Sequence, residues 1–469
     1  MMWIGGGPGV SYGGRDGVRS PDGAAGSAMS SSTVRAGTWR NWSGEQRCAP
    51  ARIVHARSVD EVASAVHAAA RDGLGVRAVG SGHSFTDAAL TDDVMIDVAG
   101  MHRILHADAA TGLVRVEAGI TIHALSAALA TLGLGMENLG DIDEQTLAGA
   151  LATGTHGTGA GLGNISTQVR AMQLVTGTGE VVELDAVADP EGLLAARVSV
   201  GALGVVTAVT LQAVPAYVLH GVDTTEPVDE VLATLDERNA AARHFEAYVF
   251  PHAPLALTRT NTVVDGPAQP PSALSRWLRQ GVLETGALAG LSEAGRAVPR
   301  AIPRLNRLVT RLAGTSVRTD RSDRIFASPR HVPFVEMEYA LPRAAAEPAL
   351  RAILAAIDRG RFAVNFPIEM RFVAGDDALL SPAHGRDTAY LAVHTYRDME
   401  WGPYFRAVEA IADEHGGRPH WGKRHFQTAD TLAPRYPGWQ RFAAVRARLD
   451  PEGRFANAYV DRVLGPVAA

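Results

Sequence analysis

The 469-residue sequence has almost no cysteine and almost no lysine. Its single cysteine, Cys48, cannot form a disulfide within the chain or build a zinc site from several thiolates. Acidic residues outnumber basic ones by 50 to 44, which gives a formal net charge of −6. These deficits exclude a disulfide-stapled scaffold, and they argue against nucleic acid as a partner. We predict no metal site.

Long uncharged stretches are present, but none has the composition of a membrane-spanning helix. Residues 145–169 contain six glycines, and residues 198–222 contain Gly201, Gly204 and Pro215 among β-branched residues. Such segments are typical of loops and strands. The N-terminus lacks a basic region followed by an apolar run, so it does not resemble a secretory signal. We therefore expect a cytoplasmic protein without a transmembrane segment.

The hydrophobic pattern predicts an α+β fold of two domains behind a leader. Residues 1–34 are rich in glycine, serine and proline without apolar periodicity, which is typical of a disordered leader. Ser58 and Glu61 form a capping-box pattern at the start of a helix. In the first domain, residues 35–215, we expect strands at 74–79, 94–98, 114–117, 172–176, 181–184 and 205–214, and a further helix at 122–132. In the second domain, residues 216–469, we expect helices at 228–243, 344–359 and 405–415, and strands at 335–340, 363–373 and 388–396. The hydrophobic pattern assigns no secondary structure to residues 267–324.

Three glycine-rich loops fall within the first predicted domain. The loop 80–84, with the sequence GSGHS, directly follows a predicted strand, and glycine can turn backbone amides onto a diphosphate there. One such loop would be an ordinary turn, but three favour a large nucleotide cofactor. The candidate cofactor-binding residues in these loops are Gly80, Ser81, Gly82, His83, Ser84, Gly154, Thr155, His156, Gly157, Gly201 and Gly204.

Polar side chains of two predicted strands in the second domain share faces. Glu369 and Arg371 are two residues apart and therefore project from the same side of a strand, as do His394 and Tyr396 on the next. Such pairs are usually a solvated sheet face. If the strands are neighbours, however, the four groups converge on a pocket.

Lysine is the most informative residue because it occurs once. Of the 44 basic residues, 43 are arginine, and the single lysine is Lys423 in the segment HWGK, residues 420–423. A compact ammonium fits beside a cofactor edge or a developing alkoxide where a guanidinium cannot. The alternative is the chance survival of one surface lysine.

Five segments together resemble the aldonolactone oxidases, a group that includes gulonolactone and arabinonolactone oxidases within the vanillyl-alcohol oxidase fold superfamily. They are residues 79–84, 154–159, 201–207, 366–372 and 418–423, and the similarity runs from about Trp39 to the C-terminus. The resemblance implies an FAD-binding domain at about 35–215, followed by a cap domain that carries most substrate contacts. It adds Gly140 and Val205 to the candidate cofactor contacts and implies a covalent bond between FAD and His83.

The resemblance also implies an activity and its catalytic residues. Glu369, Arg371 and Lys423 would lie over the reactive face of the flavin, with Glu369 or His394 as the base. The expected reaction is oxidation of a sugar 1,4-lactone, D-arabinono- or L-gulono-1,4-lactone, with hydride transfer to flavin N5, an ascorbate-type product and reoxidation by O₂. The position of Gly140 resembles one where a side chain can obstruct oxygen. Alternatives are an alditol oxidase acting on open-chain polyols, a lactone dehydrogenase with another acceptor, and a flavin-binding protein on a similar fold that is either non-catalytic or an NADPH-dependent reductase.

Overall fold

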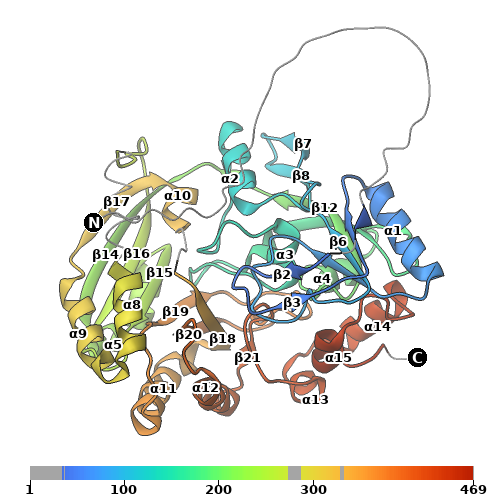
Figure 1. Ribbon diagram of the computed structural model, residues 1–469. Coiled ribbons are helices and arrows are strands. Elements are labelled where there is room, and N and C mark those ends of the chain that lie inside the picture. Colours follow the sequence, from blue (N-terminus) through green and yellow to red (C-terminus); the bar gives the residue numbers. More distant parts are fainter. Residues whose placement is uncertain (1–33, 36, 273–286, 328–331, 468–469) are drawn as a thin grey trace, which may run out of the picture. The chain divides into compact units, whose positions relative to one another are not determined.

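The computed structural model describes residues 34–35, 37–272, 287–327 and 332–467, which form one compact unit (Figure 1). The predicted leader lies outside the described residues except for Val34. The first half of the chain begins with a β-α-β unit in a four-stranded sheet ordered β1-β4-β6-β5, in which β4, β6 and β5 are parallel. Its elements are β1 (Val34–Arg35), β4 (Arg52–His55), α1 (Val59–Arg71), β5 (Val76–Val79) and β6 (Val94–Asp97). Ser58 Oγ accepts a hydrogen bond from the Glu61 amide, so the predicted N-cap of α1 is present.

A five-stranded antiparallel sheet completes the strands of this half, in the order β11-β10-β12-β8-β7. The strands are β7 (Ile104–Asp108), β8 (Leu113–Glu117), β10 (Val169–Val175), β11 (Val181–Asp185) and β12 (Val205–Gln212). The helices that accompany them are α2 (Ile122–Thr131), α3 (Leu147–Ala152) and α4 (Pro190–Ala196). Two short pairs, β2 (Trp39–Arg40) with β3 (Arg47–Cys48) and β9 (Leu134–Gly135) with β13 (Val214–Pro215), stand apart from both sheets.

The second half is built on one eight-stranded antiparallel sheet, ordered β17-β14-β16-β15-β19-β20-β18-β21. The strands are β14 (Val218–Pro227), β15 (His244–Val249), β16 (Leu255–Val264), β17 (Ser316–Arg321), β18 (Phe334–Pro342), β19 (Ile368–Val373), β20 (Thr388–Tyr396) and β21 (Arg418–Pro419). The helices are α5 (Val228–Ala233), α6 (Leu235–Ala241), α8 (Ala287–Ala297), α9 (Ile302–Leu312), α10 (Ser322–Phe326), α11 (Ala346–Gly360) and α12 (Gly402–Glu414).

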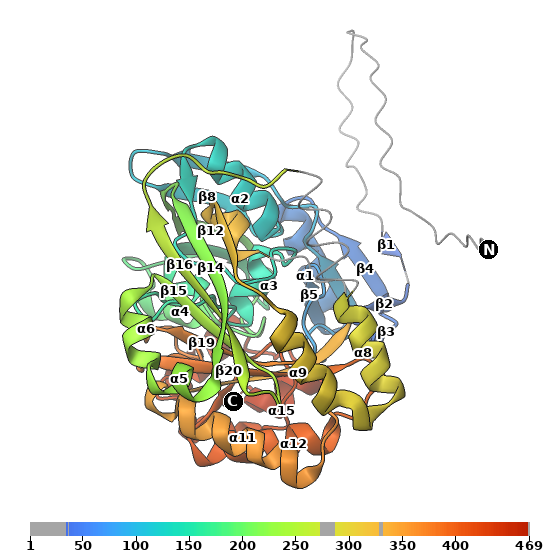
Figure 2. The same cartoon turned by 90° about the vertical axis from the view of Figure 1, so that its left-hand side faces the viewer.

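Successive side chains of the central strands of this sheet point alternately to its two sides, which provide different environments. In β18, Met337 and Tyr339 face α11 and α12, which cover one side of the sheet in both views (Figures 1 and 2). Glu336 and Glu338 alternate with them and line a cavity on the other side. Both sets are buried, so this strand has an apolar face and a charged face, neither of which is exposed to solvent.

The chain ends on three helices that pack against its first half. They are α13 (Ala429–Leu432), α14 (Trp439–Leu449) and α15 (Ala458–Leu464). Phe442, Tyr459 and Val460 from these helices belong to the same hydrophobic cluster as Val116 and Met172. The predicted domain boundary at residue 215 stays a prediction, and this packing assigns the last segment to the core of the first half.

Most of the predicted elements are present, with the following main differences. The expected helix at 228–243 is interrupted at Thr234 and divides into α5 and α6. The expected strand at 363–373 begins only at Ile368, because Pro367 has no amide hydrogen for the ladder. The two ten-residue strands β14 and β16 were not predicted at all, and neither were the shorter strands β7 and β15. Among the described residues, no helix combines the length and the apolarity needed to cross a membrane.

Candidate active site

A long cavity with about 1080 Å³ of empty space lies where the first half of the chain meets the turn 420–423. Much of its wall comes from the loop 80–84 after β5, the start of α3, the loop 199–204 before β12, and that turn. Most of these residues are glycine, alanine, serine or threonine, so backbone amides border the space with few side chains in the way. A site with this lining suits an extended nucleotide cofactor such as FAD.

Arg77 in β5 shapes the loop before β12. Its buried guanidinium donates hydrogen bonds to the carbonyls of Ala88 (2.8 Å), Val200 (3.0 Å) and Gly201 (3.1 Å). Val200 and Gly201 have positive φ angles of 55° and 68°, which is a strained conformation for a β-branched residue. Consecutive residues of this kind can present amides to an anion. Arg77 therefore stabilises a backbone shape that suits a diphosphate.

Gly80 leaves no room for a side chain. An ideal Cβ there would lie 2.0 Å from Thr146 Oγ1, a hydroxyl that accepts a hydrogen bond from the Gly149 amide at the start of α3. We therefore expect Gly80→Ala to push its loop into the cavity, with flavin absorbance per protein lowered by about half or more and the free energy of unfolding lowered by about 1–3 kcal/mol. Absorbance spectra and urea unfolding measure the two effects. Gly161→Ala is the control, because nothing lies within 4 Å of a Cβ at that position; equal losses in both variants would contradict this explanation.

The loop 80–84 and the turn 420–423 are bonded to each other. Ser84 Oγ donates to the Gly422 carbonyl (3.1 Å), and the Phe85 amide donates to the same oxygen (2.8 Å). Trp421 fixes the turn, because its side chain is fully buried and its Nε1 donates to the Leu380 carbonyl (2.7 Å). These contacts place the single lysine, Lys423, in the wall of the long cavity.

A second cavity, with about 520 Å³ of empty space, adjoins the first. Ile142, Gln145, His420 and Lys423 line both of them, so these residues form a shared wall. The rest of the second cavity is strongly charged. Its ionisable residues are Asp141, His156, Glu336, Glu338, Glu369, Arg371 and His394, besides the two of the shared wall.

Lys423 and His394 meet at one carboxylate. Lys423 Nζ forms an ion pair with Glu336, and His394 Nε2 lies 3.5 Å from the other oxygen of the same carboxylate. Burial alone would raise the pKa of Glu336, but the charge of Lys423 and the contact with His394 prevail and lower it to about 2. Because the Pro367 carbonyl, 3.2 Å from His394 Nδ1, can only accept a hydrogen bond, Nδ1 carries a proton. In the neutral ring, Nε2 is then the basic nitrogen.

A second carboxylate of strand β18, that of Glu338, lies beside two histidines. Glu338 is buried and lies 3.1 Å from His156 Nε2. Burial works to raise the pKa of Glu338, but His156 and His420 outweigh it and hold that pKa well below its ordinary value. Burial lowers the pKa of His420 to about 3, and the Gly422 amide donates to its Nδ1 (3.0 Å). His420 is therefore a neutral ring that carries its proton on Nε2.

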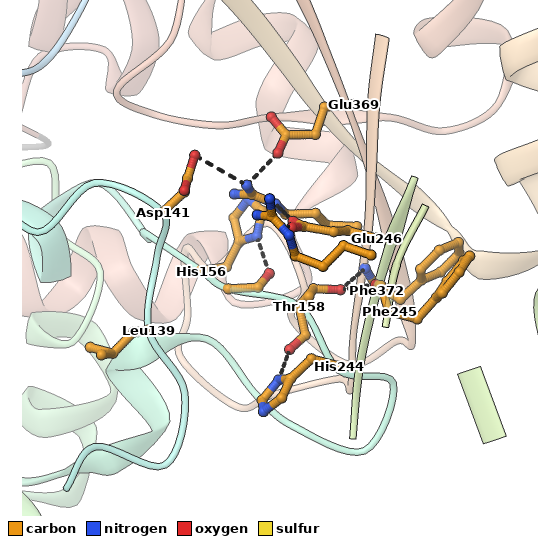
Figure 3. Close-up of polar contacts among 12 residues, drawn as sticks. Leu139, Asp141, His156, Thr158, His244, Phe245, Glu246, Glu369 and Phe372 are labelled. Atoms are coloured by element: carbon orange, nitrogen blue, oxygen red, sulfur yellow. Dashed lines mark hydrogen bonds and ion pairs between the residues drawn. The ribbon is translucent and has the colours of Figure 1, made fainter. Parts of the chain in front are cut away.

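Arg371 is the centre of an alternating ladder of charges. Figure 3 shows Asp141 and Glu369 directed at one guanidinium, that of Arg371; the Asp141 distance is 3.7 Å. Arg371 Nε also donates to Glu246 (2.9 Å). The ladder continues across neighbouring strands as the direct cross-strand partners Arg371, Glu246, Arg259 and Asp223. Burial acts to lower the pKa of Arg371, but Glu369 and Glu246 dominate and keep it well above its ordinary value, so the group is always charged.

The sequence-predicted residues divide among these places. Glu369, Arg371, His394 and Lys423 do meet, in the second cavity. The residues 80–84, Gly201 and Gly204 line the long cavity, whereas Gly140, Thr155 and His156 line the second. Gly157 lines a third, smaller cavity behind Arg371. Gly154 packs against Pro382, and Val205 is buried in a strand core, so these two predictions gain no support from the cavities.

Two differences concern residues of the predicted pocket itself. Tyr396 does not join the other three polar groups; its hydroxyl donates to Glu293 in α8 (2.6 Å). Glu336 and Glu338 were missed, although they stand two residues apart in a predicted strand. The same-face argument that identified Glu369 and Arg371 applies to them as well.

Comparisons with known proteins agree with this geometry. The family model for D-arabinono-1,4-lactone oxidase matches residues 209–463, and that for an FAD-binding domain matches residues 50–185. The chain is 50% identical to L-gulono-1,4-lactone dehydrogenase of Mycobacterium tuberculosis, over 91% of this chain and 99% of that protein. It is 34% identical to L-gulonolactone oxidase of Bos taurus, over 91% and 98%.

The fold has a counterpart among solved structures. Cholesterol oxidase from B. sterolicum superposes with a TM-score of 0.77 at 18% identity, over 95% of this chain and all of that one. The predicted two-domain α+β FAD-binding fold of the vanillyl-alcohol oxidase type is confirmed, and so is FAD as the cofactor. With a family model that covers more than half of its length and a relative at 50% identity, the chain belongs to the D-arabinono-1,4-lactone oxidase family of FAD-dependent oxidoreductases.

Proposed function

We propose that this protein oxidises a sugar 1,4-lactone, L-gulono- or D-arabinono-1,4-lactone, at the carbinol next to the lactone carbonyl. The observation that carries the proposal is the shared wall between the two cavities. Lys423 and His420 border both spaces, so a cofactor in the long cavity and a small polyol in the charged one would meet there. The second cavity is rich in hydrogen-bonding groups, which suits a small polyhydroxylated substrate.

FAD would occupy the long cavity, with its diphosphate against the loop amides of residues 80–84 and 199–204. The fit rests on the glycine lining and on the left-handed backbone at Val200 and Gly201. When bound, FAD supplies the acceptor for the hydride that leaves the carbinol carbon.

Residues of the second cavity would bind the lactone and move its hydroxyl proton. His394 Nε2 accepts that proton, and the Glu336 carboxylate beside it stabilises the resulting positive charge. Lys423 stabilises negative charge on the substrate oxygen as the proton leaves. Arg371 donates hydrogen bonds to the lactone, and Glu369 fixes the guanidinium. Glu369 is the less suitable base, because taking up a proton would break its ion pair with Arg371.

We also propose molecular oxygen as the electron acceptor. Gly140 lines the second cavity, and a Cβ there would lie 3.1 Å from the Thr155 methyl group and 3.3 Å from the His156 carbonyl. With no side chain at this position, the space beside the shared wall stays open. The relatives include both a dehydrogenase and an oxidase, so the acceptor needs its own measurement. The ascorbate-type product and the cytoplasmic location also stay predictions.

One spectroscopic experiment tests the reaction and the acceptor in turn. L-gulono-1,4-lactone and D-arabinono-1,4-lactone, added without air, are expected to bleach the flavin absorbance of the purified holoenzyme, whereas xylitol and NADPH should not. Bleaching by xylitol alone would identify an alditol oxidase, and bleaching by NADPH alone a reductase. Air is then admitted to the reduced enzyme. Rapid return of the colour with formation of hydrogen peroxide supports oxygen, while a reduced enzyme that persists in air but reacts with a quinone or cytochrome is a dehydrogenase.

We further propose that His83 bonds covalently to FAD. Its ring lines the long cavity and stacks on Trp42, with centroids 5.5 Å apart. Burial and the nearby charge of Lys423 lower the pKa of His83, so the neutral, nucleophilic form prevails at neutral pH. Acid precipitation is expected to leave flavin on the wild-type protein and to release it from His83→Ala. Release from both proteins means that the link is absent, and retention by both means that it lies on another residue.

A further inference from the structure

Helix α9 has two uncharged polar residues inside and two leucines outside. Asn306 and Thr310 are buried in this helix, whereas Leu308 is 46% exposed and Leu312 is 75% exposed. A surface helix of a soluble domain normally shows the opposite arrangement. From this reversal and the charges around it, we infer that α9 is a docking surface for an anionic lipid bilayer.

Specific contacts fix the orientation of the helix, so the exposed leucines are not a result of free rotation. Asn306 Nδ2 donates to the carbonyls of Pro251 (3.0 Å) and Val364 (3.1 Å). Ile302, at the start of the helix, is also buried. Rotation of the helix would break both hydrogen bonds of this buried amide and leave it without partners, which costs free energy. The polar anchors therefore keep the leucine side directed outward.

The exposed side of α9 combines leucine with arginine. Leu308 and Leu312 are exposed and four residues apart on one face, and the half-buried Leu305 borders them. A row of exposed arginines flanks them: Arg300, Arg304, Arg307 and Arg311. Arg307 donates to the His252 carbonyl (2.8 Å). Within the described part of the chain, the other three make no ion pair.

The charge of this segment is opposite to that of the whole protein. Residues 287–312 contain five arginines and one glutamate, whereas the net charge of the chain is −6. An amphipathic helix with arginines beside an exposed apolar stripe is the pattern of helices that lie in the headgroup region of a bilayer. Anionic headgroups attract the arginines while the leucines enter the acyl boundary.

The same charges argue against a second copy of this chain as the occupant. A twofold contact centred on α9 would place the arginine row of one copy beside that of the other. Like charges brought together in an interface cost binding energy, and nothing acidic on α9 offsets them. An anionic bilayer has the complementary charge over the whole patch.

Co-sedimentation of the FAD-loaded protein with lipid vesicles tests this inference. The probes are phosphatidylcholine vesicles with roughly one third phosphatidylglycerol and vesicles of phosphatidylcholine alone. We expect preferential binding to the anionic vesicles, weakened by high salt. Replacing two arginines, Arg304→Gln with Arg311→Gln, should weaken that binding roughly 20- to 30-fold, since each arginine near the surface contributes about a factor of five. Leu308→Ser with Leu312→Ser should weaken it by about tenfold or more.

Matched variants separate the helix from general surface effects. Leu105 in β7 is 46% exposed, like Leu308, and Arg71 is an exposed arginine at the end of α1. Leu105→Ser and Arg71→Gln should bind vesicles like the wild-type protein. Sedimentation equilibrium without lipid completes the set. Absence of vesicle binding by the wild-type protein, equal losses in the α9 and control variants, or a dimer that Leu308→Ser with Leu312→Ser dissociates would each overturn the inference.

Discussion

Replacing Arg371 by methionine is expected to lower kcat/KM by about 100- to 1,000-fold, because the substrate loses its main charged hydrogen-bond donor. The same change should lower the free energy of unfolding by about 3–5 kcal/mol. Arg371 lies within reach of Asp141, Glu246 and Glu369, and these buried carboxylates would lose their shared partner. FAD should stay bound, since Arg371 does not line the long cavity. Steady-state kinetics, urea unfolding and the flavin spectrum measure the three quantities.

Arg259→Met is the matched control for this prediction. Arg259 is the next cation of the same ladder and pairs with Glu246 (3.0 Å) and Asp223 (2.8 Å), but it lines only the cavity behind Arg371. Its loss should therefore cost stability with a much smaller effect on kcat/KM. The double variant Arg371→Met with Glu246→Gln should regain only part of the stability, since Asp141 and Glu369 still lack Arg371, and it should regain no activity. Equal kinetic losses in both single variants would mean that the ladder acts only through folding, and near-normal turnover of Arg371→Met would remove this residue from the mechanism.

The sequence predicted only some of the strands in the sheet that carries the charge ladder. Apolar periodicity located β18, β19 and β20, since these strands have one fully apolar face against α11 and α12. It missed β14 and β16, whose polar residues, such as Thr224, Thr258 and Asn261, form no apolar alternation. Their pairing depends on partners distant in the sequence, as with Asp223 and Arg259. Local pattern carries no information about such contacts.

The candidate site was predictable where a single strand or a rare residue carried the signal. Glu369 and Arg371 share a strand face, and Lys423 is the single lysine of the chain. Asp141 was not predicted as a site residue, and it reaches Arg371 because a loop of the first half enters the cavity that the sheet lines. Glu246 needed the register of β15 against β19. Strand order and register, which unite the two halves of the site, were beyond the reach of spacing arguments.

Lys423→Met is expected to slow the anaerobic reduction of the flavin by lactone by about 100-fold or more, because it removes the positive charge opposite the substrate oxygen. Lys423→Arg should slow it by about tenfold, or ~1.4 kcal/mol of barrier, since a planar fork replaces a point charge in a space that Glu336 and Phe85 already border. Stopped-flow absorbance gives both rates. A Lys423→Arg variant with wild-type kinetics would make the single lysine an accident of composition.

Glu336 makes the role of Lys423 separable from a merely structural one. The carboxylate has a pKa of about 2 in the folded protein, below its ordinary 4.5, so it stabilises the fold fully above pH 4.5 and loses this contribution as the pH falls toward 2. Lys423→Met removes the main charge that lowers this pKa. Its deficit in the free energy of unfolding should therefore be largest at neutral pH and shrink as the pH falls through that window. Adding Glu336→Gln should restore stability at neutral pH, but the rate of flavin reduction should stay below that of Glu336→Gln alone, because no cation then faces the substrate oxygen. If the double variant recovered its rate along with its stability, Lys423 would act by compensating a buried charge, and the catalytic role would belong to His394 and Arg371 alone.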